Sequence, residues 1–408
     1  ADPGAQPVQE SSRHDDIEHD EHDEQSPDLA VGSASLRRRT LIAGAVAVAA
    51  GGASAALLLP ASSRRSRTSS AAVQIPPTTL PGTRPGSTPG STLSATPVVL
   101  PDAAESAEIP DGTDLDPSTP YLTPNDSFFL IDTAWAVPEV DRDFWTLDVD
   151  GLVDRPLTIT YADLLGRPLV ERIITIGCVS NEVGGPYIGT ARWLGVPLRE
   201  ILDEAGVQDG ADQVFSTSID GWTCGFPVAD AFDGRDALIA IGMNGEPLPP
   251  DHGFPARLVV PGLYGYVSAT KWLRRITLTT WDDEGYWIPR GWSREAPVKT
   301  QSRIGMPVDG SSLPAGATVI AGVAWAMRRG IDAVEVRIDD GPWQRADLGA
   351  EPTADAWRQW RVEWSATPGD HRITVRATDG YGDVQTSDRS PVDPDGATGH
   401  HSIRVSVG

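Results

Sequence analysis

Cysteine is nearly absent from this sequence, which contains only Cys178 and Cys224 in 408 residues. Two cysteines exclude four-cysteine iron–sulfur and zinc sites, and without a CxxCH motif we expect no covalently attached haem. One disulfide between Cys178 and Cys224 stays open, but a disulfide framework is excluded. Basic residues are also scarce, with 33 Lys and Arg against 57 Asp and Glu. The net charge of −24 argues against nucleic acid as a partner, because phosphates would be repelled.

Apolar residues are few in residues 1–35, an acidic and polar stretch that we predict to be disordered. Residues 36–60 carry three arginines at 37–39 and continue as an uncharged run rich in Ala, Gly, Val and Leu. Such a run can span a bilayer, and its RRxLI start resembles a twin-arginine export signal. We expect a retained transmembrane anchor that holds the rest of the chain outside the cytoplasm, with a cleaved signal as the alternative. Residues 61–118, rich in Pro, Ser, Thr and Gly, are predicted to be a flexible tether.

Two folded domains are predicted after this tether. Over residues 119–305, short helices at 161–165 and 196–205 fall among short strands, which indicates an α+β domain. Its predicted strands are 145–151, 172–176, 213–218, 237–241, 257–260 and 276–280. Over residues 306–408 the pattern contains strands alone, which predicts an all-β immunoglobulin-like sandwich. Those strands are 318–325, 333–338, 357–364, 371–377 and 400–407, with a hairpin turn at Asp340-Gly341.

The run RIITIGCVSNEVGG (172–185) places a lone thiol where a β-branched strand ends. Cys178 therefore opens a loop of small residues, and binding groups concentrate in loops on a rigid scaffold. The alternative is that Cys178 is a small buried hydrophobe, as free cysteines often are.

A second stretch, residues 244–272, carries possible anion donors around one strand. His252, Arg257 and Lys271 frame that strand, while Ser268 and Thr270 add hydroxyls. Arg offers a bidentate fork and Lys a point charge, a combination that suits a phosphate. A solvated basic patch is the equally weighted alternative on spacing alone.

These stretches contain motifs that resemble the sulfite oxidase family of molybdopterin enzymes. In the family's order they read TIGCVSN (175–181), TARWLGV (190–196), MNG (243–245) leading to Arg257, and VPG (260–262) leading to KWL (271–273). The all-β tail, with WRQW at 357–360, resembles the family's dimerisation domain and implies a homodimer.

The resemblance implies a molybdenum–molybdopterin cofactor. Cys178 would be the thiolate ligand of molybdenum, since a soft ligand suits its sulfur-rich coordination sphere. The residues that would hold the pterin and its phosphate are His252, Arg257, Ser268, Thr270 and Lys271, with a further contact at Asp132 and Thr133.

Departures from the family concern the substrate side. Glu182 stands where sulfite oxidases carry paired arginines, Asp132-Thr133-Ala134 replaces Arg-Asn-His, and Trp292 replaces the active-site tyrosine. Glu182 and Trp292 would line the substrate side. A pocket that has lost two arginines and gained Glu182 and Asp132 should bind a small dianion poorly. A neutral or cationic sulfoxide or other S- or N-oxide therefore becomes as plausible a substrate as sulfite. A basic residue at 290, 294, 299 or 303 could restore the positive charge.

The loop around Trp222 and Cys224 falls near the pocket mouth by the same resemblance. A packed Cys224 is favoured over a second thiol beside the metal.

The sequence thus predicts two-electron oxygen-atom transfer that cycles Mo(VI) and Mo(IV), as a sulfite dehydrogenase or an S/N-oxide reductase. No haem or iron–sulfur site is expected in the chain, so electrons would pass through an external partner, either cytochrome c or a membrane quinone system. The contrasting hypothesis is a cofactor-free, membrane-tethered module whose immunoglobulin-like domain binds another protein.

Overall fold

The computed structural model describes residues 97–408, and every statement on structure below concerns these residues. The acidic segment (1–35), the predicted anchor (36–60) and most of the predicted tether lie outside them. Within the described part, none of the helices is long and apolar enough to cross a bilayer.

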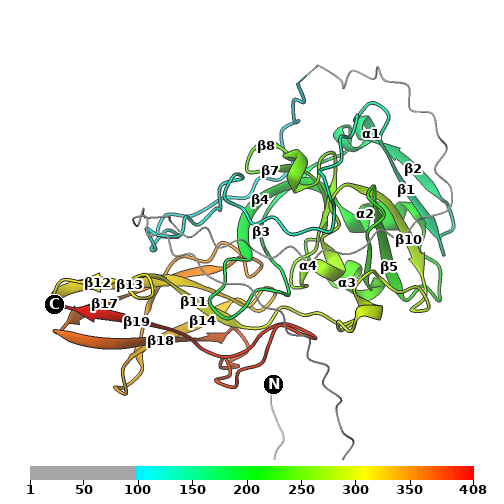
Figure 1. Ribbon diagram of the computed structural model, residues 1–408. Helices are drawn as coiled ribbons and strands as arrows, with labels where there is room; N and C mark the ends of the chain where they lie inside the picture. The colour runs from blue at the N-terminus through cyan, green and yellow to red at the C-terminus, as the bar shows by residue number, and fades with distance from the viewer. Residues whose placement is uncertain (1–96) are drawn as a thin grey trace, which may run out of the picture. The chain divides into compact units, whose positions relative to one another are not determined.

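The first half of the described chain is built on two five-stranded sheets (Figure 1). One sheet has the order β2-β1-β10-β5-β6, with β1 and β10 parallel: Leu157–Thr160, Thr146–Gly151, Leu273–Thr279, Gln213–Ser218 and Thr223–Pro227. The other has the order β3-β4-β7-β8, with β9 on β7: Val170–Gly177, Ile188–Pro197, Leu238–Met243, Glu246–Pro247 and Arg257–Val259. Together with the helices, these sheets give the α+β architecture that the strand and helix pattern predicts.

Short helices join these strands: α1 (Tyr161–Leu165), α2 (Leu198–Ala205), α3 (Val228–Phe232), α4 (Gly265–Ser268) and the 3₁₀ turns η1 (Pro250–His252) and η2 (Ile288–Arg290). Helix α1 begins where predicted, because Thr160 and Asp163 form a capping box. The prediction for α2 starts two residues early. Val196 still pairs with Ile239 as part of β4, and the helix begins only after Pro197.

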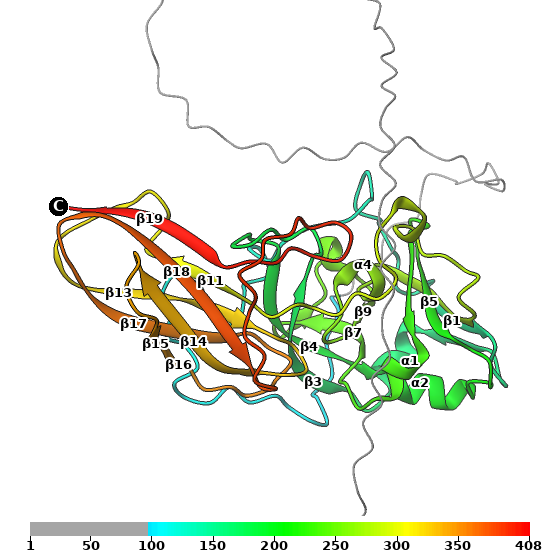
Figure 2. The same ribbon diagram turned by 90° about the horizontal axis from the view of Figure 1, so that it is seen from below.

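The second half forms two sheets that enclose one core (Figure 2). The first has the order β11-β13-β17-β16: Gln301–Met306, Gly316–Trp325, Arg358–Ala366 and Asp347–Leu348. The second has the order β12-β19-β18-β14-β15: Ser312–Leu313, His401–Val407, Gly369–Asp379, Ile331–Ile338 and Gln344–Arg345. Side chains from both sheets, such as Trp360 and Val375, share this core. The predicted β-sandwich is present, and its immunoglobulin-like connectivity stays a prediction.

The sandwich is joined to the first half through a shared core and through hydrogen bonds. Trp325, Met327 and Trp357 belong to the large apolar cluster of the α+β half. The backbone N–H of Trp357 donates to Oγ1 of Thr175 in β3 over 2.8 Å, and its indole N–H donates to the carbonyl of Tyr121 over 2.9 Å. The strand that leads to Cys178 is thus fixed from the sandwich side.

Ordered structure begins before the predicted end of the tether at residue 118. Leu100 and Ile109 pack against the large core, and Asp116 is buried. The buried side chain of Gln359 accepts from the backbone N–H of Asp116 over 2.7 Å and donates to the carbonyl of Thr119 over 2.6 Å. The predicted boundary is too late, because composition does not show that side chains such as Leu100 and Ile109 pack on the core or that Gln359 binds this backbone.

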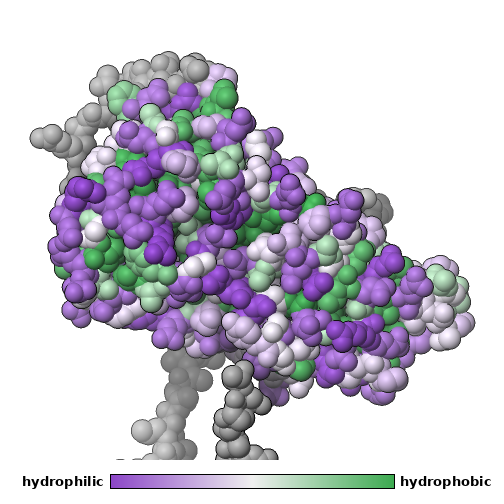
Figure 3. Space-filling model, turned by 180° about the vertical axis from the view of Figure 1, so that it is seen from behind, coloured by the Kyte–Doolittle hydropathy of each residue, from purple (hydrophilic) through white to green (hydrophobic). Residues whose placement is uncertain are grey.

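The surface is largely hydrophilic on the face shown in Figure 3, where apolar areas are small and separated. This agrees with the composition, in which acidic residues outnumber basic ones.

His401, at the start of β19, should make folding stability depend on pH. Burial, with Arg303 and Arg389 nearby and Asp309 opposing them, lowers its pKa from 6.5 to about 4. The unfolded chain therefore takes up this proton first as the pH falls. The contribution of His401 to the free energy of unfolding is therefore fully present above pH 6.5. It is lost as the pH falls from 6.5 to 4, which lowers this free energy by about 3 kcal/mol.

We expect urea unfolding to show a steeper loss of stability from pH 7 to pH 4 in the wild type than in His401→Asn. Asn does not titrate and can still accept the hydrogen bond that Ile304 N–H donates to Nδ1 of His401 over 3.0 Å. Equal slopes in the two proteins would contradict the assignment to His401.

Candidate active site

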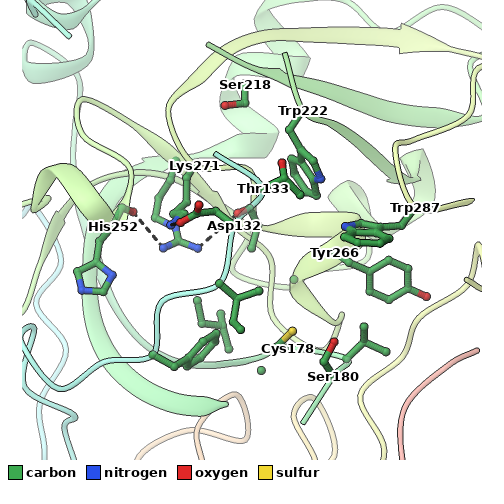
Figure 4. A pocket seen from close by; sticks show the side chains of 18 of the residues that line it. Asp132, Thr133, Cys178, Ser180, Ser218, Trp222, His252, Tyr266, Lys271 and Trp287 are labelled. Carbon is green, nitrogen blue, oxygen red and sulfur yellow. Dashed lines mark hydrogen bonds and ion pairs between the residues drawn. The ribbon is translucent and has the colours of Figure 1, made fainter. Parts of the chain in front are cut away.

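One pocket gathers most of the residues predicted to form a site. Its empty space is about 960 Å³, part of which is open to solvent. Among the predicted residues it is lined by Asp132, Thr133, Cys178, His252, Arg257, Lys271 and Trp292. Figure 4 shows Cys178 between the group formed by Lys271 and Asp132 and the rings of Tyr266 and Trp287.

Cys178 is the first residue after β3, as the strand pattern predicts. Its backbone N–H donates to the carbonyl of Tyr187 over 2.9 Å, and its own carbonyl accepts from Asn181 N–H over 3.0 Å. The thiol is 9% exposed and free, so the open disulfide alternative is not what the structure has. Burial raises the pKa of the thiol, with hydrogen bonds from Ser180 acting in the opposite direction.

Backbone pairing brings the 252–258 and 269–273 segments together. Leu258 N–H donates to the carbonyl of Thr270 over 2.9 Å, and Leu273 N–H donates to that of Ala256 over 2.9 Å. Gly253, with φ +112°, permits the close approach, since a Cβ there would lie 3.1 Å from the Cα of Lys271. Arg257 and Lys271 therefore reach one pocket despite their separation in sequence.

Arg257 is a buried cation that bonds only neutral groups. Its guanidinium donates to the carbonyls of His252 (3.1 Å), Ala269 (3.4 Å) and Leu258 (3.4 Å), and it lies over the ring of Trp193. In the described part of the chain, none of the ion pairs within 4 Å includes Arg257. Desolvation lowers its pKa to about 10. A bound anion would supply the charge that these partners do not.

Lys271 contributes a second cation, which is paired with Asp132. Its Nζ lies 2.6 Å from a carboxylate oxygen of Asp132 and donates to the carbonyl of Asp251 over 2.8 Å. Burial lowers the pKa of Lys271, and the Asp132 charge acts against this shift. Asp132 therefore lines the pocket and also holds Lys271, while its predicted contact to a cofactor stays a prediction.

His252 lies near Lys271 and Asp132, but its ring points away from Cys178. Its Nε2 bonds the carbonyl of Asn125 over 2.8 Å, and in Figure 4 the ring turns away from Cys178. Burial lowers its pKa, so the neutral imidazole is favoured. Its carbonyl, which accepts from Arg257, is its link to the cationic wall.

Three residues predicted for the site do not line the pocket. Ser268 is buried and donates to the carbonyl of Tyr264 over 3.0 Å, so its hydroxyl is used by the backbone of α4. Thr270 is fully buried and bonds Ser216 over 2.7 Å. Glu182 is exposed, because the turn that starts at Cys178 directs it to solvent. The expectation of an acid at Glu182 facing the substrate is therefore wrong.

Aromatic side chains form the wall across from Arg257 and Lys271, and the sequence patterns identified only part of it. Trp292 lines the pocket as predicted, with ring centroids 5.7 Å from Tyr266 and 6.2 Å from Trp287. Trp222 lines it too, as the family resemblance implied for its loop, and the acid near it is Asp220. Tyr266 and Trp287 were missed, although aromatic residues in turn-rich loops were a usable signal, and Ser180 and Ser218 were missed without such a signal.

None of the basic residues proposed to restore charge lines this pocket. Arg290 stacks on Tyr286, Arg294 donates to the carbonyl of Trp281, and Lys299 pairs with Asp395. Arg303 donates to the carbonyl of Gly185 over 3.0 Å. The aromatic wall thus receives no cation from these four positions.

Cys224 is a packed thiol, the favoured expectation. It is 1% exposed, lies 3.2 Å from the hydroxyl of Thr270 and 3.4 Å from that of Ser216, and does not line the pocket. Burial raises its pKa to about 11.

The donor set fits a molybdopterin cofactor. A thiol that faces a pocket can supply the soft ligand for molybdenum, and two buried cations, one without a carboxylate partner, can meet an anionic phosphate.

Comparison with known proteins points to the same chemistry. Residues 134–287 match the family model described as "Oxidoreductase molybdopterin binding domain". Sulfite oxidase of Gallus gallus is 31% identical over 321 residues, which are 67% of this chain and 70% of that protein. The uncharacterized oxidoreductase YuiH of Bacillus subtilis is 39% identical over 152 residues, 37% of this chain and 74% of that one.

Mitochondrial sulfite oxidase of Rattus norvegicus is also 31% identical, and the match spans 67% of this chain but only 58% of the rat protein. Among solved structures, the sulfane dehydrogenase SoxCD of Paracoccus pantotrophus has a TM-score of 0.60 at 24% identity, covering 78% of this chain and 93% of that one. The latter likeness concerns the fold alone. The matched domain contains Cys178, Arg257 and Lys271, and the chain belongs to the sulfite oxidase family of molybdopterin-dependent oxidoreductases.

Proposed function

We propose that this chain catalyses a two-electron oxygen-atom transfer on a small sulfur- or nitrogen-oxo substrate. The carrying observation is that the Cys178 thiol and the buried cations Arg257 and Lys271 line one pocket. Family membership supports a molybdenum cofactor and does not favour the cofactor-free binding module.

Each part of the pocket has a separate task in this proposal. Bound molybdopterin supplies the two-electron Mo(VI)/Mo(IV) chemistry. Cys178 holds the metal, and Arg257 and Lys271 bind the phosphate and orient the pterin. The aromatic rings of Tyr266, Trp287 and Trp292 exclude water from the substrate side.

The charge around the substrate side favours an organic S- or N-oxide over sulfite. Rings of Trp222, Trp287 and Trp292 and the carboxylate of Asp220 line this wall, and the cations lie across from it. A sulfite dianion would meet no opposite charge on the aromatic wall, whereas a neutral oxide meets apolar rings. The reduction consumes two electrons and two protons and releases the sulfide or amine together with water.

Further parts of the proposal concern the setting of the enzyme. We infer that an external carrier, such as cytochrome c or a quinone system, exchanges the electrons. The sandwich domain would mediate homodimerisation. Residues 36–60 would anchor the chain or direct its export by the twin-arginine route, with catalysis outside the cytoplasm. Size-exclusion chromatography with light scattering and cell fractionation test these points.

Replacing Cys178 by Ser should strongly reduce metal binding, because a neutral hydroxyl is a poor ligand for this metal. We expect about one molybdenum per chain in the wild type and a loss of about 10-fold or more in Cys178→Ser, measured by plasma mass spectrometry. The matched control is Cys224→Ser, a buried thiol outside the pocket, which should keep its molybdenum. Retention of metal in Cys178→Ser sinks the proposed role.

Arg257→Met should separate cofactor binding from stability. Met removes a desolvated cation but also leaves three carbonyls without this donor, so the free energy of unfolding of the cofactor-free protein is measured separately from cofactor binding. The substitution should reduce retained molybdopterin about 10-fold, since a charge-assisted bond contributes about 1.5–3 kcal/mol. Fluorescence of the released, oxidised pterin measures this. Arg290→Met, an exposed site, is the control, and equal pterin in both variants would refute the phosphate role.

Substrate charge can be tested by turnover. We expect a higher kcat/KM for an organic sulfoxide with reduced viologen than for sulfite with cytochrome c. Asp220→Asn should raise the relative efficiency for sulfite about fivefold by removing one repulsive charge. Glu182→Gln, which removes an exposed acid outside the pocket, should leave the ratio unchanged. A wild type that prefers sulfite would overturn the assignment of the substrate.

A further inference from the structure

The loop that carries Cys178 is held together by its own hydrogen bonds. The side chain of Asn181 is buried, and its Oδ1 accepts from Tyr187 N–H over 2.8 Å. Gly185 N–H donates to the carbonyl of Glu182 over 2.8 Å. These bonds make residues 178–187 a compact unit. A contact at its tip, Gly184 and Gly185, therefore affects the position of Cys178.

That tip rests on the β-sandwich. From β11, Arg303 donates to the carbonyl of Gly185 over 3.0 Å. From β19, the imidazole of His401 lies against Gly184, where a Cβ would collide with the ring. Gly184 has φ +82°, so both the backbone conformation and the contact require glycine.

The two sandwich residues are themselves fixed. Nδ1 of His401 accepts from Ile304 N–H over 3.0 Å, and the guanidinium of Arg303 lies 5.9 Å from the ring centroid of Trp357. The backbone of Trp357 in turn bonds Thr175 in β3, three residues before Cys178. The sandwich therefore supports Cys178 from its strand and from its loop.

We propose that Arg303 and His401 are positioning residues for Cys178, through which the C-terminal sandwich sets the place of the sulfur in the pocket. The inference rests on the proposed function only where it concerns the metal. The placement of the sulfur can be measured without the metal.

The test measures alkylation of both thiols in the full-length, cofactor-free protein, with peptide mass spectrometry as readout. Cys224, being buried outside the pocket, reports global opening. We expect Arg303→Gln and His401→Asn to raise the rate at Cys178 about tenfold without changing that at Cys224, as local opening requires. Arg303→Lys, which keeps a donor, should restore part of the protection.

Trp360→Phe is the control, because Trp360 lies in the sandwich core and its indole N–H has no hydrogen-bond partner among residues 97–408. It should destabilise the sandwich without raising the alkylation rate of Cys178 relative to that of Cys224. Parallel rises at Cys178 and Cys224 in Arg303→Gln, or no rise at either, would overturn the proposal.

In the molybdenum-loaded protein the same variants should shift the thiolate-to-metal absorption band and lower kcat per bound molybdenum about tenfold, with KM nearly unchanged. An unchanged band and kcat would count against the positioning role. If the wild type binds no molybdenum, the proposed function fails, while the alkylation rates still decide this inference.

Discussion

Among residues 97–408, the Arg257 guanidinium is held by three carbonyls and by no carboxylate, and this is the constraint on which the pocket depends. The carbonyls that bind Arg257 belong to His252, Leu258 and Ala269, so the side chain also ties together the segments that form the cationic wall. Desolvation without a counter-charge disfavours the cation, as its lowered pKa indicates. The pocket therefore favours an anion beside Arg257, and the phosphate of the proposed cofactor would supply that charge.

The thiol depends on a different support. Cys178 lies at the end of β3, which is part of a sheet of the α+β half and bonds Trp357 through Thr175. Its loop continues onto β11 and β19 through Gly184 and Gly185. The two halves of the described chain thus meet on both sides of the residue that would hold the metal, at Thr175 and at Gly184 and Gly185. This makes the sandwich a structural part of the site.

Patterns in the sequence predicted most of the framework because strand ends and helix caps are local properties. The end of β3 before Cys178 and the capping box of α1 are of this kind. Contacts between distant segments decided the rest. Ser268 and Thr270 were assigned to the site because they precede Lys271, yet their hydroxyls bond the backbone of α4 and Ser216.

The aromatic wall was hidden for a similar reason. Tyr266 and Trp287 come from different segments, and only the folded chain brings them to one pocket with Trp292. The prediction for Glu182 was wrong for the opposite reason: the residue was assigned to the pocket but faces solvent. Its position in the Cys178 motif does not show that the turn points its side chain outward. Spacing identifies which residues can do chemistry, while turn geometry decides which of them face the ligand.

The amide of Gln359 has a practical consequence for handling this protein. It is fully buried and bonds backbone groups of Asp116 and Thr119. These two residues flank residue 118, where composition alone would place the end of the tether. A protein shortened to start at residue 119 would lack the backbone N–H of Asp116, so the buried Oε1 of Gln359 would lose this hydrogen-bond donor. Truncation for crystallography should therefore begin upstream of Leu100, whose side chain already packs on the large core.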